Sequence, residues 1–366
     1  ETLNGGSADD SVTLASATTI SVSSAIETVT GSSGTDKVTI AGTITIGGVE
    51  TVSGGTGGQW LNLAAGGQTA VVDGVETVIG GSGSDSVTLG NSGITMILAA
   101  VETVAGGTGN DWVNLGARGG SVTMSGVETL IGNSGSDVIT LGASGNTMIV
   151  AGIETLTGGS GTDLITLGNR GVTVSVSNIE TLTGGTANDV ITATSSITVR
   201  GGMGADTITL TSGGGTDVVV YGAIYEGTAP GDATGYDSIT NFQAGTDDVA
   251  LTSDLRSLID DDVSGSLTVA SRASAAANMT TDEVVFLSTT VTSLADTDFA
   301  SFRTALGAVT NSSTNADLLV VANNGTSTGV YLVVDATEIG TISASEVRLL
   351  GVVNSSVLTS SDLTLA

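Results

Sequence analysis

One phrase returns along this chain at a nearly constant interval. Residues 76–89 read ETVIGGSGSDSVTL, residues 102–115 read ETVAGGTGNDWVNL, and residues 154–167 read ETLTGGSGTDLITL. The glutamate that opens the phrase recurs regularly, with one shorter interval, at Glu1, Glu27, Glu50, Glu76, Glu102, Glu128, Glu154 and Glu180. The period is about 26 residues, and a period of roughly 20–50 residues is the signature of a solenoid or another repeat array.

Each period contains three short extended pieces. Around Glu76 they are 75–79, 86–89 and 94–98, rich in aliphatic residues and separated by Gly, Asn and Ser turns. Pieces this short form no stable sheet alone, but stacked coils pair them in parallel about 4.8 Å apart. The sequence therefore predicts a mainly β protein, a parallel β-solenoid with about 26 residues per coil. Aromatic residues make up only 3% of the chain, which fits a narrow aliphatic interior.

Composition excludes several functions. Acidic residues outnumber basic ones by 37 to 8, for a net charge of −29. This excess of acidic residues argues against nucleic acid or an anionic membrane surface as a binding partner. It favours cations as partners. The chain has no cysteine and no histidine, so it lacks thiolate chemistry and the commonest general base. The chain contains no run of 18 apolar residues, so we expect no direct insertion into a membrane. Repeated carboxylates are structural more often than catalytic, so we expect no enzyme activity from this chain.

The glycine-rich part of the phrase resembles the nonapeptide G-G-x-G-x-D-x-apolar-x of the repeats-in-toxin (RTX) family. The motif GGSGSDSVT begins at Gly80 and recurs from Gly106, Gly158 and Gly201, with near matches from Gly31, Gly132 and Gly184. Residues 236–251 resemble the segment that closes such repeats. The resemblance implies Ca²⁺ between successive coils and type I secretion from a Gram-negative cell, to its extracellular surface. One departure is that the nonapeptide appears once per period here and not in tandem, which predicts calcium along one edge of the solenoid.

Physical chemistry supports calcium independently. Ca²⁺ takes six to eight oxygen ligands, both carboxylates and backbone carbonyls, and glycine turns can aim carbonyls inward. If the turn aspartates form one file at about 4.8 Å spacing, each pair repels by roughly 0.9 kcal/mol even at the dielectric of water, and several cations would relieve this repulsion. The predicted ligands are Asp10, Asp36, Asp85, Asp111, Asp137, Asp163, Asp189, Asp206 and Asp217, with Gly80, Gly106, Gly158 and Gly201. Gln59 replaces the aspartate in one turn, so we expect that site to be weak or empty. The alternative is that these aspartates only close turns.

Two further rows follow from the repeat. The glutamates are interpreted either as additional ligands or as solvated residues, and we favour the solvated interpretation. The residue after each turn aspartate predicts an outward apolar strip, formed by Trp60, Trp112, Val138, Leu164 and Val190. Such a strip favours a contact surface; the alternative is that a bulge changes which face these residues occupy. A Thr/Asn row that could bind ice is interrupted by the two tryptophans.

The last third of the chain changes in character. Phe299, Phe302 and Leu306 have helical spacing within 295–309, and strands are expected at 318–322 and 330–334. Residues 335–346 resemble an EF-hand loop, with Asp335 at position 1 and Glu346 at position 12 as candidate ligands. Positions 3 and 5 are poor ligands, so a turn without metal affinity is the alternative.

These patterns predict three parts: a calcium-binding solenoid over 1–221, a closing segment over 222–250 and a small α+β domain over 251–366 with a tail typical of type I secretion. The expected function is that of a structural surface protein, which folds in extracellular calcium and assembles with copies of itself, as in an S-layer. A calcium-folded repeat and secretion module of a larger adhesin or secreted enzyme is the alternative. The first residue is Glu1, so we expect coils upstream and, through that part, a possible cell-surface polysaccharide partner.

Overall fold

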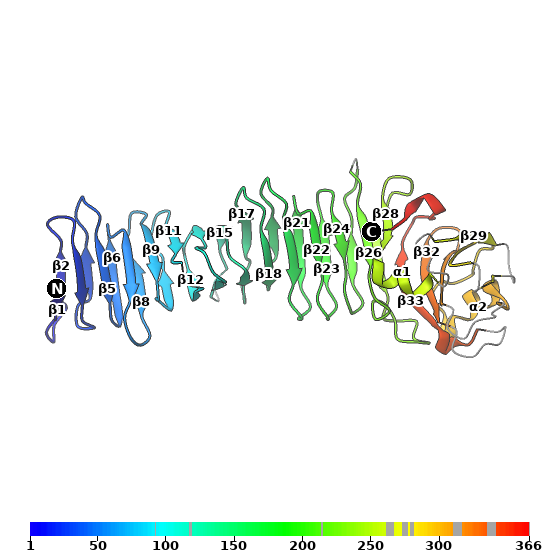
Figure 1. Cartoon of the computed structure of the whole chain (residues 1–366), viewed down its shortest axis with the longest axis horizontal. Coiled ribbons are helices and arrows are strands. Elements are labelled where there is room, and N and C mark those ends of the chain that lie inside the picture. The colour runs from blue at the N-terminus through cyan, green and yellow to red at the C-terminus, as the bar shows by residue number, and fades with distance from the viewer. Residues whose placement is uncertain are drawn as a thin grey trace. The chain divides into compact units, whose positions relative to one another are not determined.

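The computed structural model describes residues 1–91, 93–116, 119–213, 215–260, 267–272, 277–278, 282–309, 317–334 and 342–365. The chain divides into two compact units, Glu1–Ile165 (unit 1) and Thr166–Ala366 (unit 2), and the boundary falls inside strand β20 (Leu164–Leu167). Figure 1 shows short strands following one another along the chain in the solenoid part of each unit.

Unit 1 consists of two parallel sheets, in which each strand pairs with the strand two places before and after it. The odd-numbered strands form sheet A: β1 (Thr2–Leu3), β3 (Thr19–Val22), β5 (Lys37–Ile40), β7 (Thr51–Gly54), β9 (Thr69–Asp73), β11 (Ser86–Leu89), β13 (Thr103–Ala105), β15 (Ser121–Ser125), β17 (Val138–Leu141) and β19 (Thr155–Thr157). The even-numbered strands form sheet B, which ends at β20 in this unit: β2 (Ser11–Thr13), β4 (Thr28–Thr30), β6 (Thr43–Gly47), β8 (Trp60–Leu63), β10 (Thr77–Ile79), β12 (Thr95–Ala99), β14 (Trp112–Asn114), β16 (Thr129–Ile131) and β18 (Thr147–Ala151).

Strand β14 shows the length of one coil. Trp112 pairs with Thr95 in β12 and with Thr129 in β16, so it lies one coil from each of them. Other coils of unit 1 are slightly shorter or longer, as for Lys37 with Thr51 and for Thr77 with Ile97. One coil thus holds two strands, whereas one sequence repeat holds three. The parallel β-solenoid is confirmed, but the predicted coil of one whole sequence repeat is too long, because two sequence repeats make three coils.

The interior of unit 1 is filled by the middle residues of the short strands. Strand side chains alternate between the interior and the surface, and the inward ones are almost fully buried, as for Val29, Val52, Leu61, Val78 and Val113. Both sheets are therefore apolar inside and carry mostly Thr, Ser and Asn outside. The scarcity of aromatic residues follows from the narrow space between the sheets.

Unit 2 also begins as two parallel sheets. One contains β21 (Thr173–Ser177), β23 (Val190–Ala193), β25 (Thr207–Thr209) and β27 (Asp237–Thr240); the other contains β22 (Thr181–Thr183), β24 (Thr198–Arg200), β26 (Val218–Tyr221) and β28 (Asp248–Leu251). Strands from the end of the chain, β33 (Val347–Val353) and β34 (Leu363–Leu365), pair with β27 and β28. The C-terminal region therefore extends both sheets. The predicted three-part division stays a prediction.

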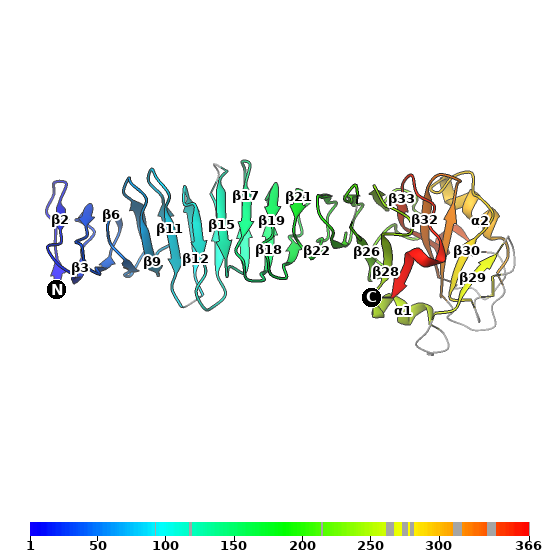
Figure 2. The same cartoon turned by 90° about the horizontal axis from the view of Figure 1, so that it is seen from above.

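The remainder of unit 2 packs around an aromatic cluster. Its strands are β29 (Val269–Arg272), β30 (Val284–Leu287), β31 (Asp317–Asn323) and β32 (Thr328–Val334), and its helical segments are α1 (Ser253–Ile259), α2 (Ala300–Leu306), η1 (Thr297–Phe299), η2 (Ala344–Glu346) and η3 (Ser360–Asp362). The ring of Phe302 stacks on Tyr331 at 3.9 Å, and the Tyr331 hydroxyl donates to the Leu294 carbonyl at 2.6 Å. Figure 2 shows α2 beside β29 and β30. The expected helix and the two expected strands are confirmed, although η1 and α2 together are shorter than 295–309.

No helix among the described residues is long and apolar enough to cross a membrane.

Candidate functional site

The predicted metal-binding aspartates lie in turns immediately before strands. Eight of the nine are buried, and Asp10 is half-buried. In unit 1 they alternate between the two sheets: Asp36, Asp85 and Asp137 precede strands of sheet A, whereas Asp10, Asp111 and Asp163 precede strands of sheet B. The prediction of a single file along one edge is therefore wrong. A repeat of one and a half coils places equivalent residues on opposite edges.

The turn aspartates after Asp10 connect two coils through their carboxylates. In Asp85, Oδ1 accepts a hydrogen bond from the Gln68 N–H of the preceding coil at 2.7 Å, and Oδ2 accepts one from the Gly81 N–H of its own turn at 2.9 Å. Asp111 and Asp163 repeat both bonds. The carboxylate thus closes its turn and joins neighbouring coils, which supports the turn-closing interpretation for these residues in the absence of a cation.

The glutamates have a structural role that the sequence analysis missed. The side chain of Glu102 accepts a hydrogen bond from the backbone N–H of Asp85 at 2.7 Å, and Glu128 accepts one from Asp111 at the same distance. Glu27, Glu50, Glu76 and Glu154 make the same contact to the turn residue one coil earlier. The favoured interpretation as solvated residues is therefore incomplete, because Glu50 and Glu76 are exposed but also accept these backbone hydrogen bonds. The signal that could have revealed the contact is the separation of Asp85 and Glu102 in the sequence, which equals one coil.

The candidate glycines allow neighbouring turns to approach closely. A Cβ atom at Gly80 would overlap the Ala100 carbonyl, and one at Gly106 would overlap the Gly126 carbonyl. At Gly201 a Cβ would overlap the carboxylate of Asp206. Gly158 lies in the equivalent turn before β20. At Gly80 and Gly106 a carbonyl oxygen of the next coil and the carboxylate of the same turn therefore lie beside the glycine, as a site for an oxygen-seeking cation requires.

Asp206 carries a buried carboxylate oxygen that a cation would stabilise. It is 1% exposed, and its Oδ2 atom has no hydrogen-bond partner in the structure. Its Oδ1 accepts the Asp189 N–H at 2.7 Å, and its own N–H donates to Asp237 Oδ1 at 3.0 Å. Three aspartates thus occupy consecutive coils. Burial, and then repulsion by Asp189 and Glu226, raises the pKa of Asp206 to about 7.

Asp137 repeats this situation in unit 1. It is fully buried and its Oδ2 also lacks a partner, while its N–H donates to the carboxylate of Glu154 at 2.8 Å. Burial raises the pKa of Asp137, and the charge of Glu154 raises it further. An aspartate and a glutamate from adjacent coils therefore face one candidate site.

Asp36 shows the contrasting case. Its carboxylate accepts the Ser32 N–H at 2.6 Å, the Ser32 hydroxyl at 2.9 Å and the Thr18 N–H at 2.9 Å. The Ser32 N–H chiefly holds the pKa of Asp36 below its ordinary value, against the effect of burial. This carboxylate is satisfied by protein groups, so a cation would gain less here than at Asp206.

The candidate sites fit Ca²⁺ only with backbone participation. Among the described residues, no three acidic side chains converge as in a preformed metal centre. Calcium accepts carbonyl oxygens alongside carboxylates, and the turns offer them. In the turn of Gln59 the amide oxygen is buried without a partner, which supplies an oxygen but no charge. The expectation of a weak site there stays a prediction.

The second predicted site is only partly described. Asp335 lies outside the described residues. Glu346 is buried, and its carboxylate accepts the Ser343 N–H at 2.6 Å at the start of η2. Glu346 therefore caps a helical turn, and the EF-hand-like interpretation stays a prediction.

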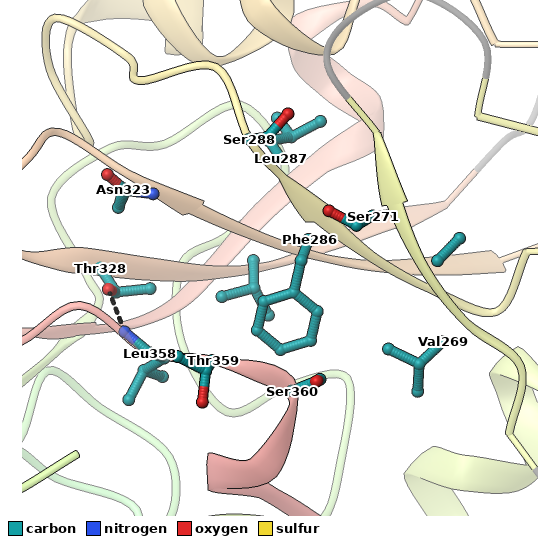
Figure 3. A pocket seen from close by; sticks show the side chains of 12 residues that line it. Val269, Ser271, Phe286, Leu287, Ser288, Asn323, Thr328, Leu358, Thr359 and Ser360 are labelled. Carbon is teal, nitrogen blue, oxygen red and sulfur yellow. Dashed lines mark hydrogen bonds between the residues drawn. The ribbon is translucent and has the colours of Figure 1, made fainter. Parts of the chain in front are cut away.

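A cavity of about 300 Å³ lies in unit 2, between β29–β31 and the segment before η3 (Figure 3). Phe286 lies at its centre, and Thr328 accepts a hydrogen bond from the Leu358 N–H at 3.0 Å on one side. Its lining contains hydroxyl, amide and aliphatic groups but no charged side chain. It is therefore unsuited to a metal ion.

Comparison with known families agrees with the aspartate and glycine turns. A family model of the RTX calcium-binding nonapeptide repeat (4 copies) matches residues 72–92, 99–117, 122–152, 149–169 and 176–195. No curated protein and no solved structure matches the chain. The matched repeat indicates a secreted calcium-binding repeat protein. Together with the parallel β-solenoid, these matches identify RTX calcium-binding nonapeptide repeats within residues 72–195.

Proposed function

We propose that this protein is a structural component of an extracellular bacterial surface, which folds when Ca²⁺ enters the turns of its solenoid and then assembles with copies of itself. The observation that carries the calcium part is the unpartnered Oδ2 of Asp206, buried between the aspartates of the two adjacent coils. A divalent cation would neutralise the Asp206 carboxylate and supply the missing partner.

The proposed ligands fall into pairs on both edges of the solenoid. In unit 1 each pair joins a turn aspartate to the glutamate one coil later, as for Asp85 with Glu102 and Asp137 with Glu154. Carbonyls of the glycine turns would complete each site. Because every site bridges two coils, metal binding and coil stacking are coupled, and binding free energy becomes folding free energy.

This coupling suits secretion. A chain of net charge −29 repels itself when compact and stays unfolded more easily without cations. Extracellular calcium modules bind with dissociation constants of roughly 10⁻⁴–10⁻³ M, so a fold of this kind forms outside the cell. A Gram-negative cell surface, type I secretion and an S-layer-like array belong to the same proposal.

The test is a Ca²⁺ titration of the chelator-treated chain, followed by far-ultraviolet circular dichroism and static light scattering on one sample. We expect β-structure to appear cooperatively and scattering to rise after it. A chain that folds with calcium but scatters as a monomer would support the alternative, a module of a larger adhesin or secreted enzyme. A chain fully folded in chelator would contradict the calcium role. Magnesium is the control, because it prefers a smaller octahedral site and retains its water.

A further inference from the structure

The outward surfaces of the two sheets of unit 1 differ in a regular way. We call the surface of sheet B face B and that of sheet A face A. Because two sequence repeats make three coils, residues two repeats apart return to the same face, and residues one repeat apart lie on opposite faces. Trp60 and Trp112 share face B, while Ser86 and Val138, each one repeat later, lie on face A. Ile97 lies on face B and its counterpart Thr123 on face A.

Face B carries a repeated column of bulky and small side chains. Thr77 pairs with Trp60 on one side and with Ile97 on the other. Three coils later, Thr129 pairs with Trp112 and with Ile149 in the same way. All four bulky side chains are exposed, Trp60 by 54% and Trp112 by 48%. The predicted apolar strip is thus divided: Leu164 joins face B, whereas Val138 lies on face A and Val190 in unit 2.

Face B is also free of charge. Strands β8 to β20 of sheet B contain no acidic or basic residue, in a chain of net charge −29. In sheet A, strands β11 to β19 are also uncharged, while β5 carries Lys37 and β9 carries Asp73. A second copy repels this chain almost everywhere by like charge. Face B therefore combines uncharged strands with exposed bulky side chains, so two copies can meet there without placing strand carboxylates against each other.

We propose that face B of one chain binds face B of a second copy, with the two sheets packed face to face. The pattern is self-complementary, because a shift of one strand places the bulky side chains of one copy over the threonines of the other. Aligned sheets pack about 10 Å apart through such interdigitation, and a two-fold axis would relate the copies. This inference rests on the self-assembly part of the proposed function and names its surface.

The available area indicates a weak, reversible contact. Seven strands at about 4.8 Å spacing, each of roughly four residues at about 3.3 Å, give a footprint of about 30 by 15 Å. Both copies together bury on the order of 1,000 Å², near the lower limit of specific interfaces. Such a contact is too small for a permanent dimer but sufficient when repeated across an array.

A flat polysaccharide is the competing occupant, because tryptophan rings can stack on sugars. Only two of the five bulky side chains on face B are aromatic, and they lie three coils apart, about 14 Å. The intervening Ile97 and the neighbouring Ile149 and Leu164 offer no ring. Aliphatic side chains between aromatic ones favour a protein partner, whose own apolar groups bury them.

The experiment uses the full chain in millimolar calcium and sedimentation velocity over micromolar to sub-millimolar protein. We expect reversible association in the wild type. The variant Trp60→Thr/Ile97→Thr/Trp112→Thr/Ile149→Thr should weaken it at least tenfold. The face A control Val71→Thr/Val138→Thr should associate as the wild type does. Circular dichroism with and without calcium follows folding separately, so a failure of calcium binding is distinguishable from a failure of association.

A second readout needs no variant. The chain contains two tryptophans, both on face B, so their fluorescence emission should shift to shorter wavelength as the protein concentration rises. A folded wild type that stays monomeric without this shift would overturn the proposal, as would association retained by the face B variant. Binding of the monomer to an insoluble neutral polysaccharide, lost in that variant, would overturn it in favour of a sugar ligand.

Discussion

Replacing Asp206 with asparagine should stabilise the chain in chelator and should lose that advantage in calcium. In chelator the wild type holds a buried carboxylate whose Oδ2 has no partner, between Asp189 and Asp237. The difference between a pKa of about 7 and the ordinary value of 3.8 corresponds to on the order of 4 kcal/mol at alkaline pH. A buried amide carries its own desolvation cost, so Asp206→Asn should raise the free energy of unfolding by about 1–3 kcal/mol there.

Calcium should cancel this stabilisation. A ligand present at about 100 times its dissociation constant stabilises a protein by about 2.7 kcal/mol, and the neutral amide loses most of that gain. Urea unfolding of both proteins, in chelator and in saturating calcium, measures the two differences. A variant destabilised equally under both conditions would refute the reasoning, because the carboxylate would then act only as a turn acceptor.

Asp36→Asn is the matched control. The Asp36 carboxylate is already partnered by Ser32 and Thr18, so its replacement should cost about 1–3 kcal/mol with or without calcium.

The pH dependence of the chelated wild type follows from the same group. The pKa of Asp206 is higher in the folded chain than in the unfolded chain, so the folded state binds the proton more tightly. This contribution to stability is complete below about pH 4 and is lost as the pH rises through about 7. Asp206→Asn should make this slope shallower without abolishing it, because burial also raises the pKa of Asp189, Asp217 and Asp237. An unchanged slope in urea unfolding would show that those other groups cause it.

Three further predictions concern the repeat. Gly80→Ala should destabilise the chain by several kcal/mol in thermal unfolding, because its Cβ would overlap the Ala100 carbonyl, while Gly58→Ala, with open space around it, should be close to neutral. Glu128→Ala should cost about 1–3 kcal/mol by leaving the backbone N–H of Asp111 in the preceding coil without its acceptor, and an unaltered urea midpoint would argue against a stabilising role for this hydrogen bond. Gln59→Asp should add calcium to the stoichiometry measured by isothermal titration calorimetry; an unchanged count would mean that this turn cannot bind.

The C-terminal region shows which structural elements local sequence patterns can predict and which they cannot. The helical spacing of Phe299, Phe302 and Leu306 predicted a helix that α2 largely matches, and the two predicted strands form the antiparallel pair β31–β32. The return of β33 and β34 to the solenoid strands β27 and β28 had no local signal. Pairing between segments so far apart in the sequence depends on the free edges that the completed solenoid presents.

The sequence by itself determined the parallel β-solenoid, because a regular repeat of short aliphatic pieces and glycine turns can bury its apolar side chains only by stacking. It also determined the aspartate turns, since their spacing and composition are visible residue by residue. Only the tertiary structure decided how many strands make one coil. One coil contains two strands around this narrow interior, whereas one sequence repeat contains three strands. Equivalent aspartates in consecutive repeats therefore lie on opposite edges of the solenoid. The two tryptophans, which are two repeats apart, lie on the same face. That ratio of two strands to three depends on how the sheets pack across the interior, which no single repeat encodes.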